Sequence, residues 1–141
     1  MTIKEIEQEI ENEFSMFDDW MDKYNYLIEL GEECPLIEEK DKNDNNLIKG
    51  CQSKVWVSAK MCKDVMDIKA DSDALITKGI ITLLLRVFNH QKPEDVKDAD
   101  LHFIDNIGLT QHLSPTRSNG LLSMIKQIKL YAMAFSMQNN K

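Results

Sequence analysis

The chain has 141 residues, of which 43% are hydrophobic and 29% are charged, and its formal net charge is −7. This length fits one domain that can bury a substantial core. Because phosphate binding requires a basic surface, the acidic balance argues against a nucleic-acid partner. The charge is compatible with a basic patch on a partner protein, although solubility alone explains it equally well.

The sequence indicates neither export nor membrane insertion. Residues 1–5 lack a cationic start followed by an apolar core, so we predict no secretory signal. The densest apolar run, 79–88, contains Arg86 and is too short to span a bilayer. The three cysteines, an odd number, are typical of free thiols in a reducing compartment rather than of a disulfide framework. We therefore expect a cytoplasmic protein without membrane contact.

Apolar residues recur every three or four positions at the start of the chain, which predicts an amphipathic N-terminal helix that we assign to residues 1–23. Thr2 followed by Glu5 has the pattern of a capping box that begins this helix. Ser15 followed by Asp18 is a second capping pair and predicts a break near Ser15. The acidic outer face of the first segment is most simply a solvated surface, with a partner-docking face as the alternative.

The middle of the chain predicts a loop and then a β-hairpin. Gly31 is a stop signal for the helical region. The charged, asparagine-rich run 38–46 has no period, so we expect a loop there. Two runs rich in valine, tryptophan and isoleucine, 52–61 and 65–70, predict antiparallel strands joined at residues 63 and 64.

The rest of the chain predicts helices. A polar cap at 71–73 precedes a helix that runs to about His90, and its apolar residues cover most of the circumference, so we expect it at the centre of the core. Gly79 in the middle of this helix costs about 1 kcal/mol relative to alanine, which predicts that another backbone approaches closely there.

Prolines and glycines delimit the remaining helices. Pro93 is expected to open a short helix, and another is expected from Leu101 to Gly108. Pro115 is expected to begin the last helix, and residues 136–141 to form a frayed tail. The sequence contains no internal repeat and no linker, so residues 1–141 are expected to form a single domain.

Cys51 directly follows Gly50, between the polar loop and the predicted hairpin. Glycine adopts backbone angles closed to other residues and suits a turn that projects the next side chain outward. The polar and cationic neighbours Lys49, Gln52 and Lys54 argue against burial and favour the thiolate, which is the nucleophilic form. This pattern indicates an accessible reactive thiol. The competing interpretation is that Cys51 is a small buried apolar residue, which is the commoner role of a single cysteine.

Other chemistry-bearing residues give weaker signals. The three histidines lie far apart and outside any nucleophile motif, which disfavours a Cys–His hydrolase. A zinc or cluster site formed by the cysteines with a histidine is supported by ligand count alone. The polar residues 117–120 leave two interpretations open. Arg117 and Asn119 could hydrogen-bond loop backbone, or Arg117 could bind a carboxylate of a partner.

Four blocks of the sequence carry a family likeness. They read YLIELG at 26–31, GCQSKVW at 50–56, DSDA followed by KG within 71–79, and LTQHLSPTRSNGL at 109–121. In their order and spacing these blocks resemble the SufE family of sulfur-acceptor proteins. The likeness spans about 24–134.

The resemblance implies an α+β fold in which a small antiparallel sheet packs against several helices, as in SufE and IscU-type proteins. It implies that Cys51 takes persulfide sulfur from a pyridoxal-phosphate cysteine desulfurase of the SufS kind and stimulates that enzyme. The sulfur is then relayed to a SufBCD-like scaffold for iron–sulfur cluster assembly, with no cofactor or metal on the acceptor. The resemblance also implies that five residues contact the partner: Gly50, Gln52, Ser53, Asp73 and Arg117.

Several alternatives stay open beside this resemblance. Two sister branches, serving SufS-like and CsdA-like desulfurases, both fit the residues, and relatives suggest a homodimer. The chain could instead be a zinc- or cluster-binding scaffold that uses Cys51 with other thiols, or a purely regulatory desulfurase subunit. Cys34 and Cys62 depart from the family pattern. We expect inert packing at both, with resolution of the persulfide into a disulfide as the alternative.

Overall fold

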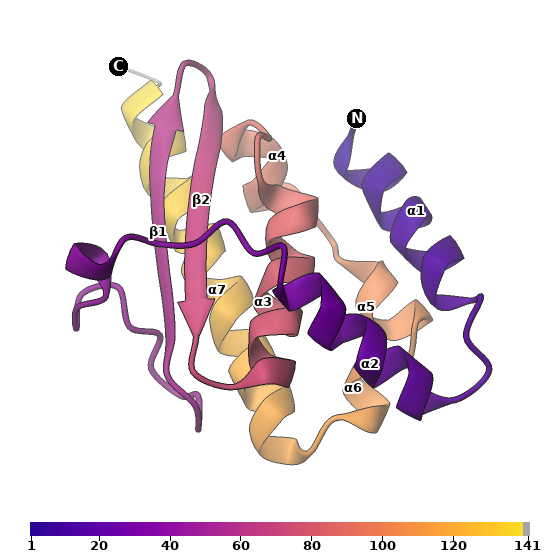
Figure 1. Ribbon diagram of the computed structural model, residues 1–141. Coiled ribbons are helices and arrows are strands. Elements are labelled where there is room, and N and C mark those ends of the chain that lie inside the picture. Colours follow the sequence, from indigo (N-terminus) through magenta and orange to yellow (C-terminus); the bar gives the residue numbers. More distant parts are fainter. Residues whose placement is uncertain (140–141) are drawn as a thin grey trace.

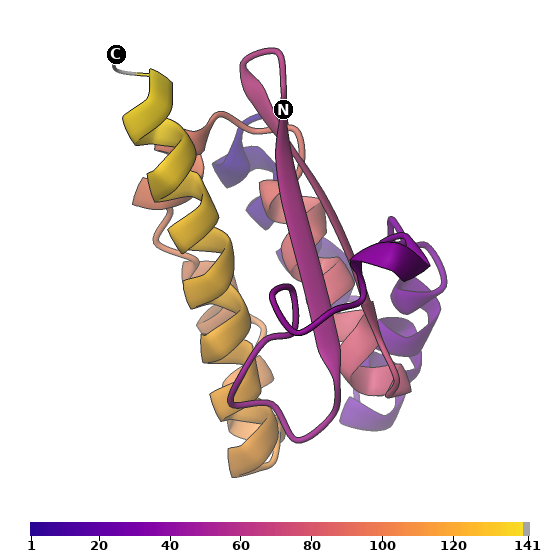
Figure 2. The same cartoon turned by 90° about the vertical axis from the view of Figure 1, so that its left-hand side faces the viewer.

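The β-hairpin lies in front of two long helices, and the other helices flank them (Figure 1). Residues 1–139, the part described in this computed structural model, contain one two-stranded antiparallel sheet and seven α-helices. The hairpin packs against α3 (Leu75–Phe88) and α7 (Pro115–Asn139), and Figure 2 shows α7 running alongside it. The expected α+β class is confirmed.

Helix α1 (Ile3–Phe14) begins at the predicted capping box. The backbone N–H of Glu5 donates to Thr2 Oγ1 at 3.2 Å, and the N–H of Thr2 donates to Glu5 Oε1 at 3.1 Å. The prediction of a helix over residues 1–23 is wrong in its extent, because α1 ends at Phe14.

The break near Ser15 is confirmed, but Ser15 does not begin the next helix. Ser15 is the C-cap of α1. Helix α2 (Trp20–Gly31) begins after Asp19, whose carboxylate accepts the N–H of Asp22 at 2.9 Å. Asp19, four residues after Ser15, therefore caps α2 in place of Ser15. Gly31 ends α2 as predicted.

Arg86 of α3 ties α1 to the core. Its guanidinium donates to Glu9 Oε1 at 2.7 Å and to Glu13 Oε1 at 2.7 Å, and the hydroxyl of Tyr26 also donates to Glu13. Part of the acidic face predicted to be solvated is thus bonded to the core. The hydrogen bonds from Arg86 hold the pKa of Glu13 below its usual range.

Replacing Glu13 with glutamine should flatten the loss of stability in acid. A carboxyl group with a lowered folded-state pKa stabilises the fold above its unfolded-state pKa of about 4.3, and this contribution disappears as the pH falls through the folded-state value. Wild-type unfolding free energy should therefore fall more steeply below about pH 4.3 than that of Glu13→Gln. Urea unfolding across this range measures both slopes. Equal slopes would contradict the role given to Arg86.

The close approach predicted at Gly79 occurs between α3 and α2. A Cβ atom on Gly79 would lie 2.1 Å from the carbonyl oxygen of Leu27, and one on Gly31 would lie 3.1 Å from the backbone nitrogen of Gly79. Real Cβ atoms do not come as close as 2.1 Å, so glycine is required at position 79, while a side chain at position 31 would make a tight contact that needs a small shift.

Gly79→Ala should destabilise the protein by about 3 kcal/mol, because the added methyl group overlaps backbone that cannot rotate away. Chemical unfolding followed by circular dichroism measures the change. Ala134→Gly, at an exposed position of α7, is the control. It changes helix propensity alone and should destabilise the protein by about 1 kcal/mol. A Gly79→Ala penalty no larger than that would contradict the close approach.

The predicted hairpin is confirmed, with β1 at Val55–Cys62 and β2 at Val65–Ser72. The pair is antiparallel and turns at Lys63 and Asp64, where Lys63 has a φ of 60°. Alternate side chains of the two strands point into the core, as half-buried strands require. Those that are buried are Val55, Val57, Met66, Ile68 and Ala70.

The chain before the hairpin covers both edges of the sheet. Leu36 forms an isolated bridge with Ala70 of β2, and Leu47 forms one with Trp56 of β1. The expected loop between these bridges contains one turn of 3₁₀ helix, Glu39–Asp41. Because these bridges occupy edge hydrogen-bonding groups, they reduce the backbone available for pairing with another chain.

The helix cap predicted at 71–73 is wrong. Asp71 and Ser72 belong to β2, and the N-cap of α3 is Ala74, which makes no side-chain capping bond. The carboxylate of Asp71 instead pairs with Lys42 at 2.7 Å and with Lys78 at 3.3 Å. Although its burial alone would raise the pKa of Asp71, the hydrogen bonds from these lysines keep that pKa low.

The last part of the chain follows the predicted helices with two changes. The helix expected from Leu101 to Gly108 is shorter, and Gly108 (φ 76°) separates it from a further one-turn helix. The expected fraying from residue 136 is wrong over 136–139, because α7 continues to Asn139 and Ser136 is buried. Residues 140–141 lie outside the described residues.

The helices before α7 are α4 (Pro93–Asp98), α5 (His102–Asn106) and α6 (Leu109–His112).

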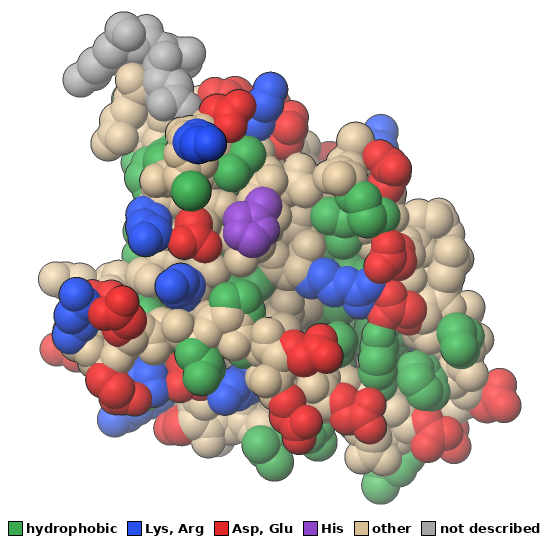
Figure 3. Space-filling model, turned by 45° about the horizontal axis from the view of Figure 1, so that its top comes forward, with side chains coloured by type: hydrophobic (Ala, Val, Ile, Leu, Met, Phe, Trp, Pro, Cys, Tyr) green, Lys and Arg blue, Asp and Glu red, His purple; other side chains and the backbone are tan. Residues whose placement is uncertain are grey.

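Charged side chains are spread over the surface. On the face shown in Figure 3, acidic and basic groups are mixed over the upper and left parts, whereas the lower right carries acidic side chains beside hydrophobic ones. Within residues 1–139, none of the helices combines the length and the apolar character that a membrane span requires.

Candidate functional site

Gly50 sets the position of the loop that carries Cys51. Its φ is +91°, in the region that favours glycine, and a Cβ atom there would lie 2.8 Å from Ser123 Oγ of α7. The turn predicted at this glycine is confirmed. The loop closes where the N–H of Ile48 donates to the carbonyl of Val55 at 2.8 Å, so residues 49–54 project from a hydrogen-bonded base.

Asp73 holds the other end of this loop. Its Oδ1 accepts the N–H of Lys54 at 3.0 Å, and its own N–H donates to the carbonyl of Lys54 at 3.2 Å. Asp73 is exposed, so it can contact a partner as predicted, but the structure already gives it a role in holding the loop.

Cys51 is half-buried and lies against α7. Its Sγ is 3.7 Å from the carbonyl oxygen of Gly120, to which the thiol can donate, and a Cβ atom on Gly120 would lie 3.3 Å from this sulfur. Burial raises the pKa of the Cys51 thiol. The expectation that its neighbours favour the thiolate is therefore wrong for this conformation. Lys49 and Lys54 are exposed and do not line the pocket that Cys51 faces.

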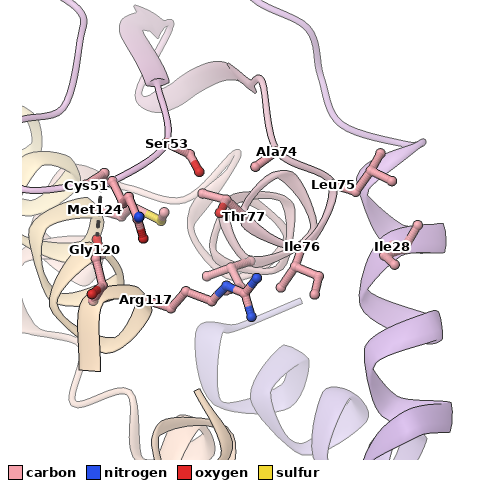
Figure 4. Close-up of a pocket in the computed structure, with 13 residues that line it drawn as sticks. Ile28, Cys51, Ser53, Ala74, Leu75, Ile76, Thr77, Arg117, Gly120 and Met124 are labelled. Atoms are coloured by element: carbon pink, nitrogen blue, oxygen red, sulfur yellow. Dashed lines mark hydrogen bonds between the residues drawn. The ribbon is translucent and has the colours of Figure 1, made fainter. Parts of the chain in front are cut away.

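This pocket has a volume of about 350 Å³ and lies between the Cys51 loop, the start of α3 and the start of α7 (Figure 4). Of the predicted partner-contact residues, Gln52, Ser53 and Arg117 line it with Cys51. Gly50 and Asp73 do not line the pocket and position the loop, and their contact with a partner stays a prediction. The other lining residues are mostly apolar: Ile28, Ala74, Leu75, Ile76, Thr77, Ile80, Thr116, Gly120 and Met124.

Arg117 is the charged side chain among these lining residues. Its backbone N–H donates to Ser114 Oγ at 3.3 Å. Within residues 1–139, neither its guanidinium nor the side chain of Asn119 makes a hydrogen bond or ion pair, and both residues are exposed. The interpretation that they bond loop backbone is therefore wrong, while contact between Arg117 and a partner stays a prediction.

Thr77 is a pocket residue that the sequence analysis missed. It is only 8% exposed, and within residues 1–139 its hydroxyl has no hydrogen-bond partner. One signal was present in the sequence. A threonine near the start of a helix that is apolar around most of its circumference is a polar group without an obvious reason to be buried.

The other two thiols lie elsewhere. Cys34 is buried with its Sγ 3.4 Å from the carbonyl of Ala70, and this burial raises its pKa. Cys62 is exposed at the far end of β1, about 23 Å along the strand from Val55. Neither lines the pocket with Cys51. Within the part of the chain described, no group of three or more metal-ligating side chains converges.

The fold and the site together define a class: an α+β protein in which a loop before a β-hairpin brings one cysteine to a pocket between two helices. The model of the SufE family, described as the Fe-S metabolism associated domain, matches residues 8–132. The chain therefore belongs to the SufE family, and the resemblance seen in the sequence is confirmed.

A solved structure supports the fold. The chain is similar to the solution structure of a hypothetical protein from Thermus thermophilus, with a TM-score of 0.76 and 17% sequence identity. The match covers 92% of this chain and 94% of that chain. At this identity the likeness establishes a shared fold.

Gly120→Ala should expose Cys51 without unfolding the protein. Alanine is favoured over glycine in a helix by up to about 1 kcal/mol, so the unfolding free energy should stay level or rise. The new methyl group contacts Sγ and should move the loop outward, which lowers the thiol pKa by relieving burial. Iodoacetamide should then label Cys51 severalfold faster at neutral pH. The measurement uses a background in which Cys34 and Cys62 are serine. An unchanged rate would contradict this contact.

Proposed function

We propose that this protein is a sulfur carrier. In this proposal Cys51 accepts persulfide sulfur from a cysteine desulfurase of the SufS or CsdA kind, and the protein stimulates that enzyme. It then relays the sulfur to an iron–sulfur scaffold of the SufBCD kind in the cytoplasm. One observation carries the proposal. In a member of a family associated with Fe–S metabolism, Cys51 stands on a loop that turns at Gly50 and lines the pocket between α3 and α7.

The chemistry of the transfer requires only a thiol on the acceptor. The Cys51 thiolate attacks the outer sulfur of the persulfide on the desulfurase, and a new S–S bond forms on Cys51. The S–S bond of the donor breaks, and its electron pair stays on the donor cysteine, which leaves as a thiolate and takes up a proton. The transferred sulfur keeps its oxidation level, as in thiol–disulfide exchange.

The half-buried position of Cys51 suits a carrier that works on demand. A thiol with a raised pKa is a poor nucleophile at neutral pH, which limits wasteful reactions between encounters. Docking must therefore draw the loop outward. The anchors at Ile48 and Lys54 would keep the hairpin in place while the residues between them move.

The residues around the pocket mouth would form the docking surface. Gln52 and Arg117 are exposed there, with Ser53 beside them, and Gly50 and Asp73 shape the loop. The planar guanidinium of Arg117 suits a carboxylate on the partner. The net charge of −7 would favour encounter with a basic patch. The homodimer suggested by relatives stays a prediction.

Incubation with a SufS-type desulfurase and free cysteine should add one sulfur atom to Cys51. Intact-protein mass spectrometry before and after reduction detects the added sulfur, and peptide mapping after alkylation locates it. Cys51→Ser should lose the added mass completely and should also lose the stimulation of the desulfurase.

Cys34→Ser and Cys62→Ser are the matched controls and should load like the wild type. Loading of Cys51→Ser would assign the carrier role to another cysteine. Stimulation that survives in Cys51→Ser or Cys51→Ala would favour a purely regulatory subunit instead. The zinc- or cluster-scaffold alternative requires stoichiometric metal that is lost on Cys51 substitution, and the separate positions of the three cysteines give it no convergent ligands among the described residues.

A further inference from the structure

We propose that the pocket contains an anion subsite for the outer sulfur of the Cys51 persulfide. It is built from the Thr77 hydroxyl and the uncapped amino end of α3, with Arg117 at the pocket mouth. The inference rests on the proposed sulfur-carrier function and specifies how the cargo is held.

The amino end of α3 is free to bind an anion. Ala74 provides no side-chain cap, and the first backbone bond of the helix runs from the N–H of Lys78 to the carbonyl of Ala74 at 2.8 Å. Within residues 1–139, the N–H groups of Leu75, Ile76 and Thr77 have no acceptor. All three residues line the pocket. Unpaired first-turn N–H groups of a 14-residue helix attract negative charge.

The residues that could have capped this helix are used elsewhere. The Asp73 carboxylate accepts the N–H of Lys54 at 3.0 Å, and Ser72 Oγ accepts the N–H of Ala74 at 3.3 Å. The cap is therefore missing at the one end of α3 that opens into the pocket.

Thr77 gives an independent indication of a ligand. Its side chain is more than nine-tenths buried and points into the pocket with its hydroxyl unpaired (Figure 4). Thr82, the other buried threonine of α3, is 7% exposed and donates to the carbonyl of Lys78 at 2.7 Å. No enclosed side-chain nitrogen or oxygen among residues 1–139 lacks a partner, so the Thr77 oxygen must reach the open pocket volume. This hydroxyl can therefore donate to a ligand in the pocket.

The charges around the pocket favour a small anion. Arg117 is the charged residue in its lining, and the walls formed by Ile28, Ile80 and Met124 are apolar. An anion in such walls is costly unless hydrogen bonds and a cation compensate. Charged residues adjacent in sequence to the lining residues are paired or exposed: Asp73 bonds the Lys54 backbone, Lys78 pairs with Asp71, and Lys49 and Lys54 are exposed.

The resting thiol leaves this subsite empty. Cys51 Sγ is directed at the Gly120 carbonyl on α7. A second sulfur, one bond of about 2.0 Å further on, would have room in the pocket that Cys51 and Thr77 both line. Gly120 accepts from a protonated thiol, whereas Thr77 and the α3 N–H groups donate, so the site discriminates the neutral thiol from the anionic persulfide.

Thr77→Val, which keeps the shape of the side chain and removes the hydroxyl, tests the subsite. Proteins lacking Cys34 and Cys62 are loaded with sulfur by a desulfurase and cysteine. The rate at which iodoacetamide alkylates the outer sulfur is then followed against pH by mass spectrometry, which resolves loaded from unloaded chains. Thr77→Val removes the proposed hydrogen bond to the anionic outer sulfur. The pH at which the alkylation rate is half its maximum should therefore rise by about one to two units.

Three variants complete the design. Thr77→Ser keeps a hydroxyl and should restore the wild-type midpoint, and Thr82→Val removes a hydroxyl from the same helix outside the pocket and should not move it. Thr77→Ala gives a second measurement should the valine variant fold poorly. If the wild type loads with sulfur but the Thr77 and Thr82 variants have the same midpoint, the subsite is overturned and the carrier function is left intact. A wild type that cannot load would overturn the carrier function itself.

Discussion

The site depends on the contact between the Cys51 loop and one face of α7. Gly120 and Ser123 are three positions apart, so they lie on the same side of the helix. Gly120 lies against the Cys51 sulfur, and Ser123 lies where a side chain at residue 50 would otherwise be. A larger residue at either glycine would push the loop away from α7. The two glycines therefore allow the loop to lie this close to α7.

Helix α3 connects this site to the rest of the fold. Its amino end forms one wall of the pocket, Gly79 in its middle meets the backbone of α2, and Arg86 near its end holds α1. The contact at Gly79 fixes α2 relative to α3, and Ile28 of α2 is also a pocket residue. The position of the pocket wall is thus set by backbone contacts, which change less readily than side-chain packing.

Local patterns in the sequence predicted much of this fold. The capping box at Thr2, the hairpin turn at Lys63 and the backbone angle of Gly50 each depend on residues close in the chain, and each was predicted correctly. The cap at 71–73 was not, because Asp71 pairs with Lys42, whose approach depends on tertiary structure. Local propensity cannot weigh such a contact.

The candidate site was also predicted only in part. The family resemblance picked out Cys51, and the structure brings Gln52, Ser53 and Arg117 to the same pocket. The expectation that neighbouring residues favour the thiolate was wrong, because Lys49 and Lys54 are exposed and lie outside the pocket, while residues of α3 and α7 line it with Cys51. Thr77 was missed for the same reason, since its burial and its unpaired hydroxyl become visible only when the helices are assembled.

A sulfur carrier must meet two opposed demands, and this pocket offers a different set of groups for each. Between transfers, the thiol should be unreactive, and an apolar setting with a carbonyl acceptor keeps the proton on sulfur. After transfer, the outer sulfur should stay on Cys51 and not react with water or with other thiols. A helix terminus and a hydroxyl donor stabilise charge there without a neighbouring base. The placement of acceptor on α7 and donors on α3 would let one cavity serve the empty and the loaded carrier.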